Sequence, residues 1–203
     1  MIYAWVLLPL TELFLKPDEH NMEAAEEELA KKNRLYDYML YIIVPFQYVA
    51  LFYFLISMGQ AELTVWDKAG RILSMGLLCG TFGINVAHEL GHRVNKFEQF
   101  LAKALLATSL YIHFFIEHNK GHHKNVATPE DPSSARYNEP VYTFYFRTII
   151  FSYLSAWKIA NDDCRKKGKS IFSLHNEMVQ AHIVQMILVA VIYFFAGWLI
   201  CLY

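Results

Sequence analysis

Long apolar stretches alternate with short charged segments along the chain. Residues 38–58, YMLYIIVPFQYVALFYFLISM, contain no charged side chain, and the stretches 1–15, 70–87 and 179–203 are also mostly apolar. A helix needs about 20 apolar residues to cross the hydrocarbon core of a bilayer. We therefore predict membrane-spanning helices at these four places, with the first one partial.

Two further apolar stretches carry a polar interruption. Residues 99–116 contain Lys103 and His113, and residues 141–157 contain Arg147. Both patterns suit either a spanning helix or a helix lying in the membrane interface. Histidine clusters flank 99–116, and a full crossing there would put them on opposite faces of the bilayer. We therefore expect both stretches to be interfacial or re-entrant.

These patterns predict an all-α fold, an integral membrane helical bundle with interfacial helices. Length favours one membrane domain over residues 1–203. The connection 158–169 is rich in lysine and arginine. Because basic loops stay on the cytoplasmic side, we expect the histidine clusters at that side of the membrane.

Composition excludes several classes of protein. The chain has 203 residues and is 55% hydrophobic, above the ~45–50% typical of soluble domains. Lys+Arg total 18 against 19 Asp+Glu, so no basic field points to nucleic acid. The three cysteines share no short spacing, which argues against a disulfide framework or a thiolate metal site.

Histidines provide the strongest functional signal. Five of the nine fall in two windows, NVAHELGHRVNK at 85–96 and FIEHNKGHHKNVATPEDP at 115–132. The five are His88, His92, His118, His122 and His123. Side chains four apart share one face of an α-helix. Two such pairs on neighbouring helices can converge on one or two divalent ions, and imidazole suits Zn, Fe, Cu and Ni.

Carboxylates lie close to both windows. Metal-bound imidazoles commonly donate their second N–H to a carboxylate, so Glu89 and Glu117 are expected beside the ligands, with Glu130 and Asp131 as further candidates. Salt bridges to nearby lysines are the alternative role. His113, five residues before the second cluster, suits either a supporting position or helix packing.

The five letters HELGH allow two interpretations. In a zinc protease, His88 and His92 would bind zinc, and Glu89 would act as general base. That interpretation needs only one further, distant ligand. The remaining histidines of the second cluster would then have no role. In an oxygenase, both clusters would serve one two-metal site containing a redox-active metal, which zinc is not.

The motifs HELGH, EHNKGHH and NVATPEDPSSAR, together with SLHNEM at 173–178, resemble those of the integral-membrane alkane hydroxylases. These non-haem di-iron enzymes are related more distantly to membrane fatty-acid desaturases. The resemblance extends from about Pro9 to the end of the chain. It implies that the five histidines are iron ligands and that Glu89 supports the site rather than acting as a base.

The resemblance also implies an activity. Family members hydroxylate the terminal methyl group of medium-chain alkanes with O₂ and two electrons, at two iron ions. Rubredoxin, reduced by rubredoxin reductase, supplies the electrons, and the enzyme lies in the bacterial inner membrane as a multi-pass protein surrounded by lipid. Aromatic residues such as Trp5, Phe52, Phe54 and Phe82 are of the kind that could limit alkane length. A fatty-acid desaturase or related oxygenase is the alternative within this chemistry.

The chain departs from the family in one respect. Family members carry two further histidine motifs, of the N-Y-x-E-H-Y-G and Q-R-H-S-D-H-H kinds, and neither is present in residues 1–203. We therefore expect this chain to be a truncated domain that is inactive alone, and the complete protein to be longer.

Overall fold

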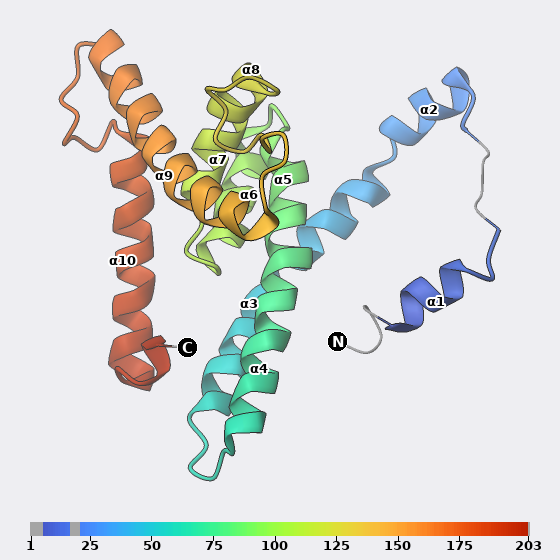
Figure 1. Ribbon diagram of the computed structural model, residues 1–203, viewed down its shortest axis with the longest axis vertical. Coiled ribbons are helices and arrows are strands. Elements are labelled where there is room, and N and C mark those ends of the chain that lie inside the picture. The colour runs from blue at the N-terminus through green and yellow to red at the C-terminus, as the bar shows by residue number, and fades with distance from the viewer. Residues whose placement is uncertain (1–5, 17–20, 203) are drawn as a thin grey trace. The chain divides into compact units, whose positions relative to one another are not determined.

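The computed structural model describes residues 6–16 and 21–202, and every regular element among them is helical (Figure 1). The predicted all-α class is therefore confirmed for the described part of the chain. The α-helices are α1 Leu8–Glu12, α2 Ala24–Lys31, α3 Arg34–Met58, α4 Val65–Leu78, α5 Asn85–Gly91, α6 Lys96–Ala107, α7 His113–Glu117, α8 His123–Asn125, α9 Val141–Lys166 and α10 Glu177–Ala196. Two π-helical segments, η2 Cys79–Ile84 and η3 His118–His122, and one 3₁₀ turn, η4 Ile200–Leu202, complete the set.

The chain forms two compact units, Met1–Ile42 and Ile43–Tyr203. The first contains α1, α2 and the first residues of α3. The carboxylate of Glu26 caps the start of α2 by accepting the backbone N–H of Glu23 at 3.3 Å. Part of the expected span 1–15, including Trp5, lies outside the described residues, and α1 within it is only five residues long.

Among the described residues, three helices are long and apolar enough to cross a membrane. They are Arg34–Met58, Val65–Gly91 and Glu177–Ala196, which overlap the stretches expected to span at 38–58, 70–87 and 179–203. The second of them joins α4, η2 and α5 without interruption.

Helix termini follow ordinary capping chemistry. The hydroxyl of Thr64 accepts the backbone N–H of Asp67 at 3.1 Å, and Asp67 accepts the backbone N–H of Thr64 in return. This reciprocal capping box begins α4. Asn176 begins α10 in the same manner, because its side-chain oxygen accepts the backbone N–H of Met178 at 2.9 Å.

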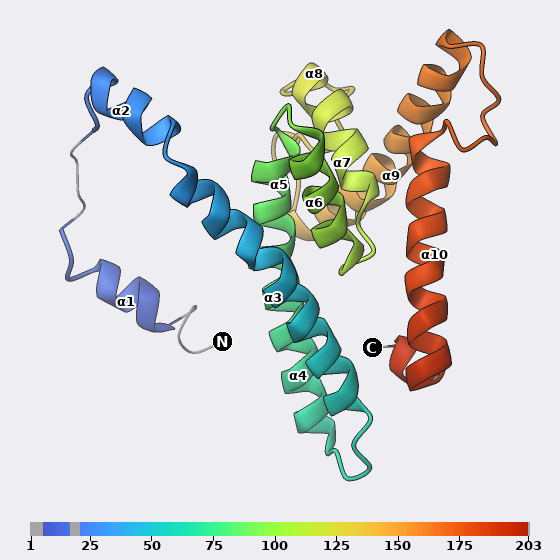
Figure 2. The same ribbon diagram turned by 180° about the vertical axis from the view of Figure 1, so that it is seen from behind.

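Two small apolar clusters lie within the second unit. Phe54 and Met58 of α3 meet Met75 of α4 and Ile200 of η4, and both views show α3 beside α4 (Figures 1 and 2). The other cluster joins α7, α9 and α10 through Ile116, Ala156, Ala160 and Met178. Alanines four residues apart on α9 let the helices approach closely.

The apolar stretch 99–116 is not one helix. α6 ends at Ala107, and the hydroxyls of Thr108 and Ser109 bond the carbonyls of Leu105 and Leu106. Leu110 then adopts a φ of 54°, and α7 starts at His113. Because neither helix reaches the length needed to cross a bilayer, this stretch can return the chain to the side from which it came.

Arg147 fixes the loop between α8 and α9. Its guanidinium donates to both carboxylate oxygens of Glu139 at 2.7 Å, and to the carbonyls of Pro132 and Ser134 at 2.8 Å. Both charged side chains are largely buried, at 10% and 7% exposed. Bidentate pairs of this kind are strong and directional, so Arg147, expected only as a polar interruption, holds the loop in place.

Glu139→Gln should remove this clamp's pH-dependent stability. Hydrogen bonds from Arg147 lower the pKa of Glu139 from 4.5 to about 2, although burial opposes the shift. The folded state thus favours the ionised carboxylate, and its contribution is present above pH 4.5 and lost as the pH falls toward 2. We expect the melting temperature of the variant to be lower at neutral pH and to change less than wild type across that window. Glu130→Gln, at an exposed position in the same loop, is the control; identical pH profiles for Glu139→Gln and wild type would contradict the clamp.

Candidate metal centre

Four imidazoles from two separate helical segments meet at one point. His88 and His92 come from the end of α5, while His118 begins η3 and His123 begins α8. The Nε2 atoms of His88 and His92 are 3.0 Å apart, those of His92 and His118 are 3.1 Å apart, and those of His118 and His123 are 3.1 Å apart. One nitrogen of each ring lies within 4.8 Å of all the others. The two histidine windows therefore share one site.

The π-helical segment η3 decides which side chains of the second window converge. Within it, the backbone N–H of His123 reaches the carbonyl of His118, five residues back. This wider turn places residues five apart on one face, whereas an α-helix does so for residues four apart. As a result His123, rather than His122, completes the group of four with His118.

Hydrogen bonds alone cannot satisfy these contacts. An imidazole nitrogen offers either one proton or one lone pair in the ring plane. His92 and His118 each face two neighbouring nitrogens at about hydrogen-bonding distance, so at least one of the three contacts lacks a proton. A cation at the centre would accept all of the lone pairs.

The spacing also fits a bound transition metal. Two nitrogens that each lie about 2.1 Å from one ion are roughly 3.0 Å apart at a right angle and roughly 3.4 Å apart at the tetrahedral angle. The contacts of 3.0 and 3.1 Å between neighbouring nitrogens match the right-angled case. The four histidines can therefore ligate one ion, with adjacent positions for further ligands.

The surroundings favour the neutral form of two of these rings, His92 and His118, and neutral imidazole is the form that binds metal. Burial, and then the neighbouring histidines, lower the pKa of His118 from 6.5 to about 3. The pKa of His92 is also lowered, by burial and by His88 and His123, although Glu89 opposes the shift. Neutral imidazole is the ligand form, so the site does not have to lose protons at neutral pH before it binds an ion.

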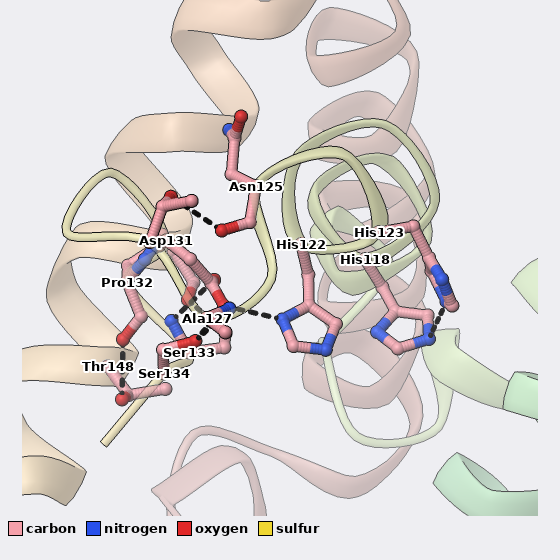
Figure 3. Close-up of polar contacts among 12 residues, drawn as sticks. His118, His122, His123, Asn125, Ala127, Asp131, Pro132, Ser133, Ser134 and Thr148 are labelled. Atoms are coloured by element: carbon pink, nitrogen blue, oxygen red, sulfur yellow. Dashed lines mark hydrogen bonds and ion pairs between the residues drawn. The ribbon is translucent and has the colours of Figure 1, made fainter. Parts of the chain in front are cut away.

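His122 points to a carboxylate instead of joining the four nitrogens (Figure 3). Its Nδ1 lies 2.9 Å from Oδ2 of Asp131, whose side chain is fully buried. The ring of His122 stacks on that of His118, with centroids 5.3 Å apart. Because Nδ1 donates to the carboxylate, Nε2 of His122 keeps its lone pair for a metal on the other edge of the ring.

Asp131 is held firmly for this role. It accepts the Ser133 backbone N–H at 2.9 Å and the Ser134 hydroxyl at 2.5 Å (Figure 3). Burial tends to raise the pKa of Asp131, but these hydrogen bonds and His122 together lower it. The carboxylate is therefore ionised, and it accepts a hydrogen bond from the Nδ1–H of His122. Thr148 of α9 fixes the same loop by donating to the carbonyl of Pro132 at 2.9 Å.

The carboxylates expected beside the ligands take different positions. Glu89 lies on the exposed side of α5, with Oε1 3.4 Å from the guanidinium of Arg93. Glu117 is buried, and burial followed by the charge of Asp131 raises its pKa, while the Ser155 hydroxyl and His122 lower it. Glu117 thus lies within electrostatic range of His122 and Asp131, whereas Glu89 acts on His92 only through its charge and pairs with Arg93.

His113 belongs to a different group of rings. It lies between Tyr111 and Tyr153, at centroid distances of 4.6 and 5.2 Å, and burial followed by His182 lowers its pKa to about 4. Tyr153 in turn donates to Nε2 of His182 at 2.8 Å, since Nδ1 of His182 donates to the carbonyl of Met178. His113 therefore packs behind the metal centre, on the side of α9 and α10.

Close packing requires the glycine in the second window. A Cβ atom on Gly121 would lie 2.5 Å from Oε1 of Glu117 and 3.0 Å from Cδ1 of Ile159. An added Cβ atom would therefore displace the Glu117 carboxylate and press on Ile159 of α9. This glycine has no predicted role from the sequence alone, and the signal was its position between His118 and His122 in EHNKGHH.

Comparison with known proteins places this site in a family context. Residues 67–203 match the fatty acid desaturase family. The chain is 36% identical to alkane 1-monooxygenase 1 of Alcanivorax borkumensis over 100% of this chain and 50% of that protein. It is 36% identical to alkane 1-monooxygenase of Ectopseudomonas oleovorans over 91% of this chain and 46% of that protein, and 35% identical to that of Pseudomonas putida over 94% and 47%. The chain thus spans about half the length of the curated relatives it matches.

Gly121→Ala should destabilise the segment that carries the second histidine window. Forcing an extra carbon into packed space typically costs about 1–3 kcal/mol. We expect a lower free energy of unfolding in denaturant titrations of the detergent-solubilised protein. Gly70→Ala is the matched control, because a Cβ atom there meets nothing within 4 Å. Equal stabilities of the two variants would show that the close approach of η3 to α9 is not required.

Asp131→Asn should weaken metal binding, because an amide has only one oxygen to accept the hydrogen bonds that the carboxylate now accepts. Loss of a carboxylate that orients a metal-ligating histidine typically costs about 10–100-fold in metal affinity. Chelator competition followed by elemental analysis measures this, and Glu130→Gln in the same loop is the control. Unchanged affinity in Asp131→Asn would mean that His122 is not a ligand or does not depend on this hydrogen bond.

Proposed function

Because the chain belongs to the fatty acid desaturase family, within which it groups with alkane hydroxylases, we propose that the whole protein hydroxylates the terminal methyl of medium-chain alkanes. The reaction uses O₂ and takes electrons from rubredoxin, itself reduced by rubredoxin reductase. The observation that carries this proposal is the convergence of four imidazole nitrogens from two helical segments within 4.8 Å.

The donor set fits a histidine-ligated iron centre. His88, His92, His118 and His123 would hold one ion, and His122 would contribute its free Nε2 toward a second. Imidazole binds iron as well as zinc, copper and nickel, and the family resemblance supports iron among them. When bound, two irons supply the activation of O₂ and the oxidation of the C–H bond. The protein residues supply orientation: α5 and η3 fix four rings, and Asp131 fixes the fifth.

An apolar cavity gives the alkane a place in the membrane-facing part of the fold. About 350 Å³ of space lies between α3, α4 and α10, with walls that include Phe54, Met75 and Ile192. That volume is within the range of small-molecule sites, and such a wall suits a substrate without polar groups. Phe54, expected as a residue that could limit alkane length, lines this cavity.

The cavity ends near the helix that carries the first histidines. Cys79 and Thr108 line that end, and the amide of Gln47 contacts both, at 3.5 and 3.4 Å. His88 follows Cys79 on the same continuous helix, about 13 Å further along at the usual rise per residue. The polar end of the cavity therefore lies toward the metal centre, along the helix that continues into α5.

The zinc-protease alternative requires a different use of Glu89. As a general base, its carboxylate must reach a metal-bound water. The carboxylate of Glu89 instead pairs with Arg93, and a protease would leave ligands of the second window without a role. The oxygenase proposal accounts for both windows.

For the membrane, we propose a multi-pass protein of the bacterial inner membrane whose basic 158–169 connection and metal centre face the cytoplasm.

The complete protein, reconstituted with rubredoxin and its reductase, should convert octane into 1-octanol. With isotopically labelled O₂, the alcohol should carry the label, and purified protein should contain iron. His118→Ala should abolish the product and reduce the iron content, because the His118 ring contacts both His92 of the first window and His123 of the second. His175→Ala, an exposed histidine outside the centre, should leave both unchanged. Formation of an alkene would favour a desaturase, and zinc with peptide cleavage would favour a protease; either result would overturn the proposal.

A further inference from the structure

A second cavity lies on the opposite side of the second histidine window. It has a volume of about 880 Å³ and lies between the loop that follows α8 and one face of α9. The α9 residues recur at helical spacing and change in character along the helix. They run from Arg147 through Phe151 and Leu154 to Lys158, Asp162 and Lys166. The wall is therefore apolar near one end and charged near the other.

The charged end has more free cations than anions. Lys120 is neutralised, because its ammonium contacts Asp163 at 2.9 Å and Glu177 at 3.0 Å. Arg147 is likewise bound to Glu139.

Three further ammonium groups lie on the cavity wall. Lys124, Lys158 and Lys166 are exposed, and none of them forms a salt bridge among the described residues, although Lys166 acts on Asp163 at longer range. The acidic wall residues are Glu130, Asp162 and Asp163, of which the last two contact Arg165 and Lys120. With six basic residues against these three acidic ones, the wall carries an excess of positive charge.

The exposed surface of α9 locates this cavity at the membrane boundary. The first half of the helix exposes large apolar side chains: Phe146 is 72% exposed, Ile150 54% and Leu154 52%. The second half is charged and ends in Arg165–Lys166. A helix with that distribution contacts lipid along its first half and water along its second. Glu177, which pairs with Lys120, also marks the first residue of the spanning helix α10.

We propose that this cavity binds the headgroup of an anionic phospholipid. The phosphate would lie against Lys124, Lys158 and Lys166, and the acyl chains would lie over Phe151 and Leu154. Basic pockets at the cytoplasmic ends of membrane helices recognise anionic headgroups in this manner. The mixed wall favours a lipid over an acidic protein, because its apolar end adjoins the half of α9 that exposes Phe146, Ile150 and Leu154, where acyl chains can pack. Binding here would brace η3 against α9, since Lys120 and Gly121 form part of the same wall.

The experiment compares lipids on the complete protein in a neutral detergent. Short-chain phosphatidylglycerol, phosphatidylcholine of the same chain length and inorganic phosphate are each titrated, and the melting temperature is recorded. A ligand that binds only the folded state raises the melting temperature with concentration. We expect a saturable rise with phosphatidylglycerol that the other two do not produce at equal concentration.

Lys158→Gln combined with Lys166→Gln tests the assignment of the site. Each basic residue near an anionic lipid contributes about fivefold in affinity, so the double variant should bind phosphatidylglycerol about tenfold or more weakly. The control is Lys167→Gln with Lys169→Gln, which removes the same charge from α9's end but outside the cavity, and it should bind like wild type. Equal responses to the two lipids, an equal response to inorganic phosphate, or full binding by the cavity variant would each overturn the proposal. So would a stabilising response to an acidic polypeptide with none to phosphatidylglycerol.

Discussion

Four imidazole nitrogens held within 4.8 Å of one another are the constraint on which the rest of the structure depends. Such nitrogens repel one another wherever two lone pairs meet, and protonation is disfavoured because burial and neighbouring rings lower the pKa of His118. A single cation relieves every one of these contacts at once. The fold therefore holds the ligands in position for an ion, and the neighbouring features stabilise that arrangement.

Three features of the fold hold the histidine rings in this arrangement. The turn at 108–112 allows α7 to return toward α5, so both histidine windows lie on one side. The π-helical segment turns His118 and His123 inward and leaves His122 to Asp131. Small residues on α9 and at Gly121 let η3 and α7 approach closely, while Lys120 ties this segment to α9 and α10 by ion pairs.

Much of this arrangement could be predicted from local sequence, and some of it could not. The spacing of His88 and His92 predicts their shared face. The apolar stretches predict four spanning helices, and three of these stretches form helices long enough to span a membrane in the described part of the chain. The π-helical turn has no letter pattern of its own, because it results from packing against α9. Asp131 was one of four nearby carboxylates, and only the fold of the loop selects it. The break at Leu110 falls in a stretch whose letters all suit a helix.

The central claim is that the rings of α5 and those of the η3–α8 segment bind the same metal centre. An experimental density map of the iron-loaded complete protein, with anomalous signal at the iron edge, tests it most directly. The account predicts an iron peak about 2.1 Å from Nε2 of both His92 and His118. Iron bound by only one of the two windows, or no iron between them, would contradict it.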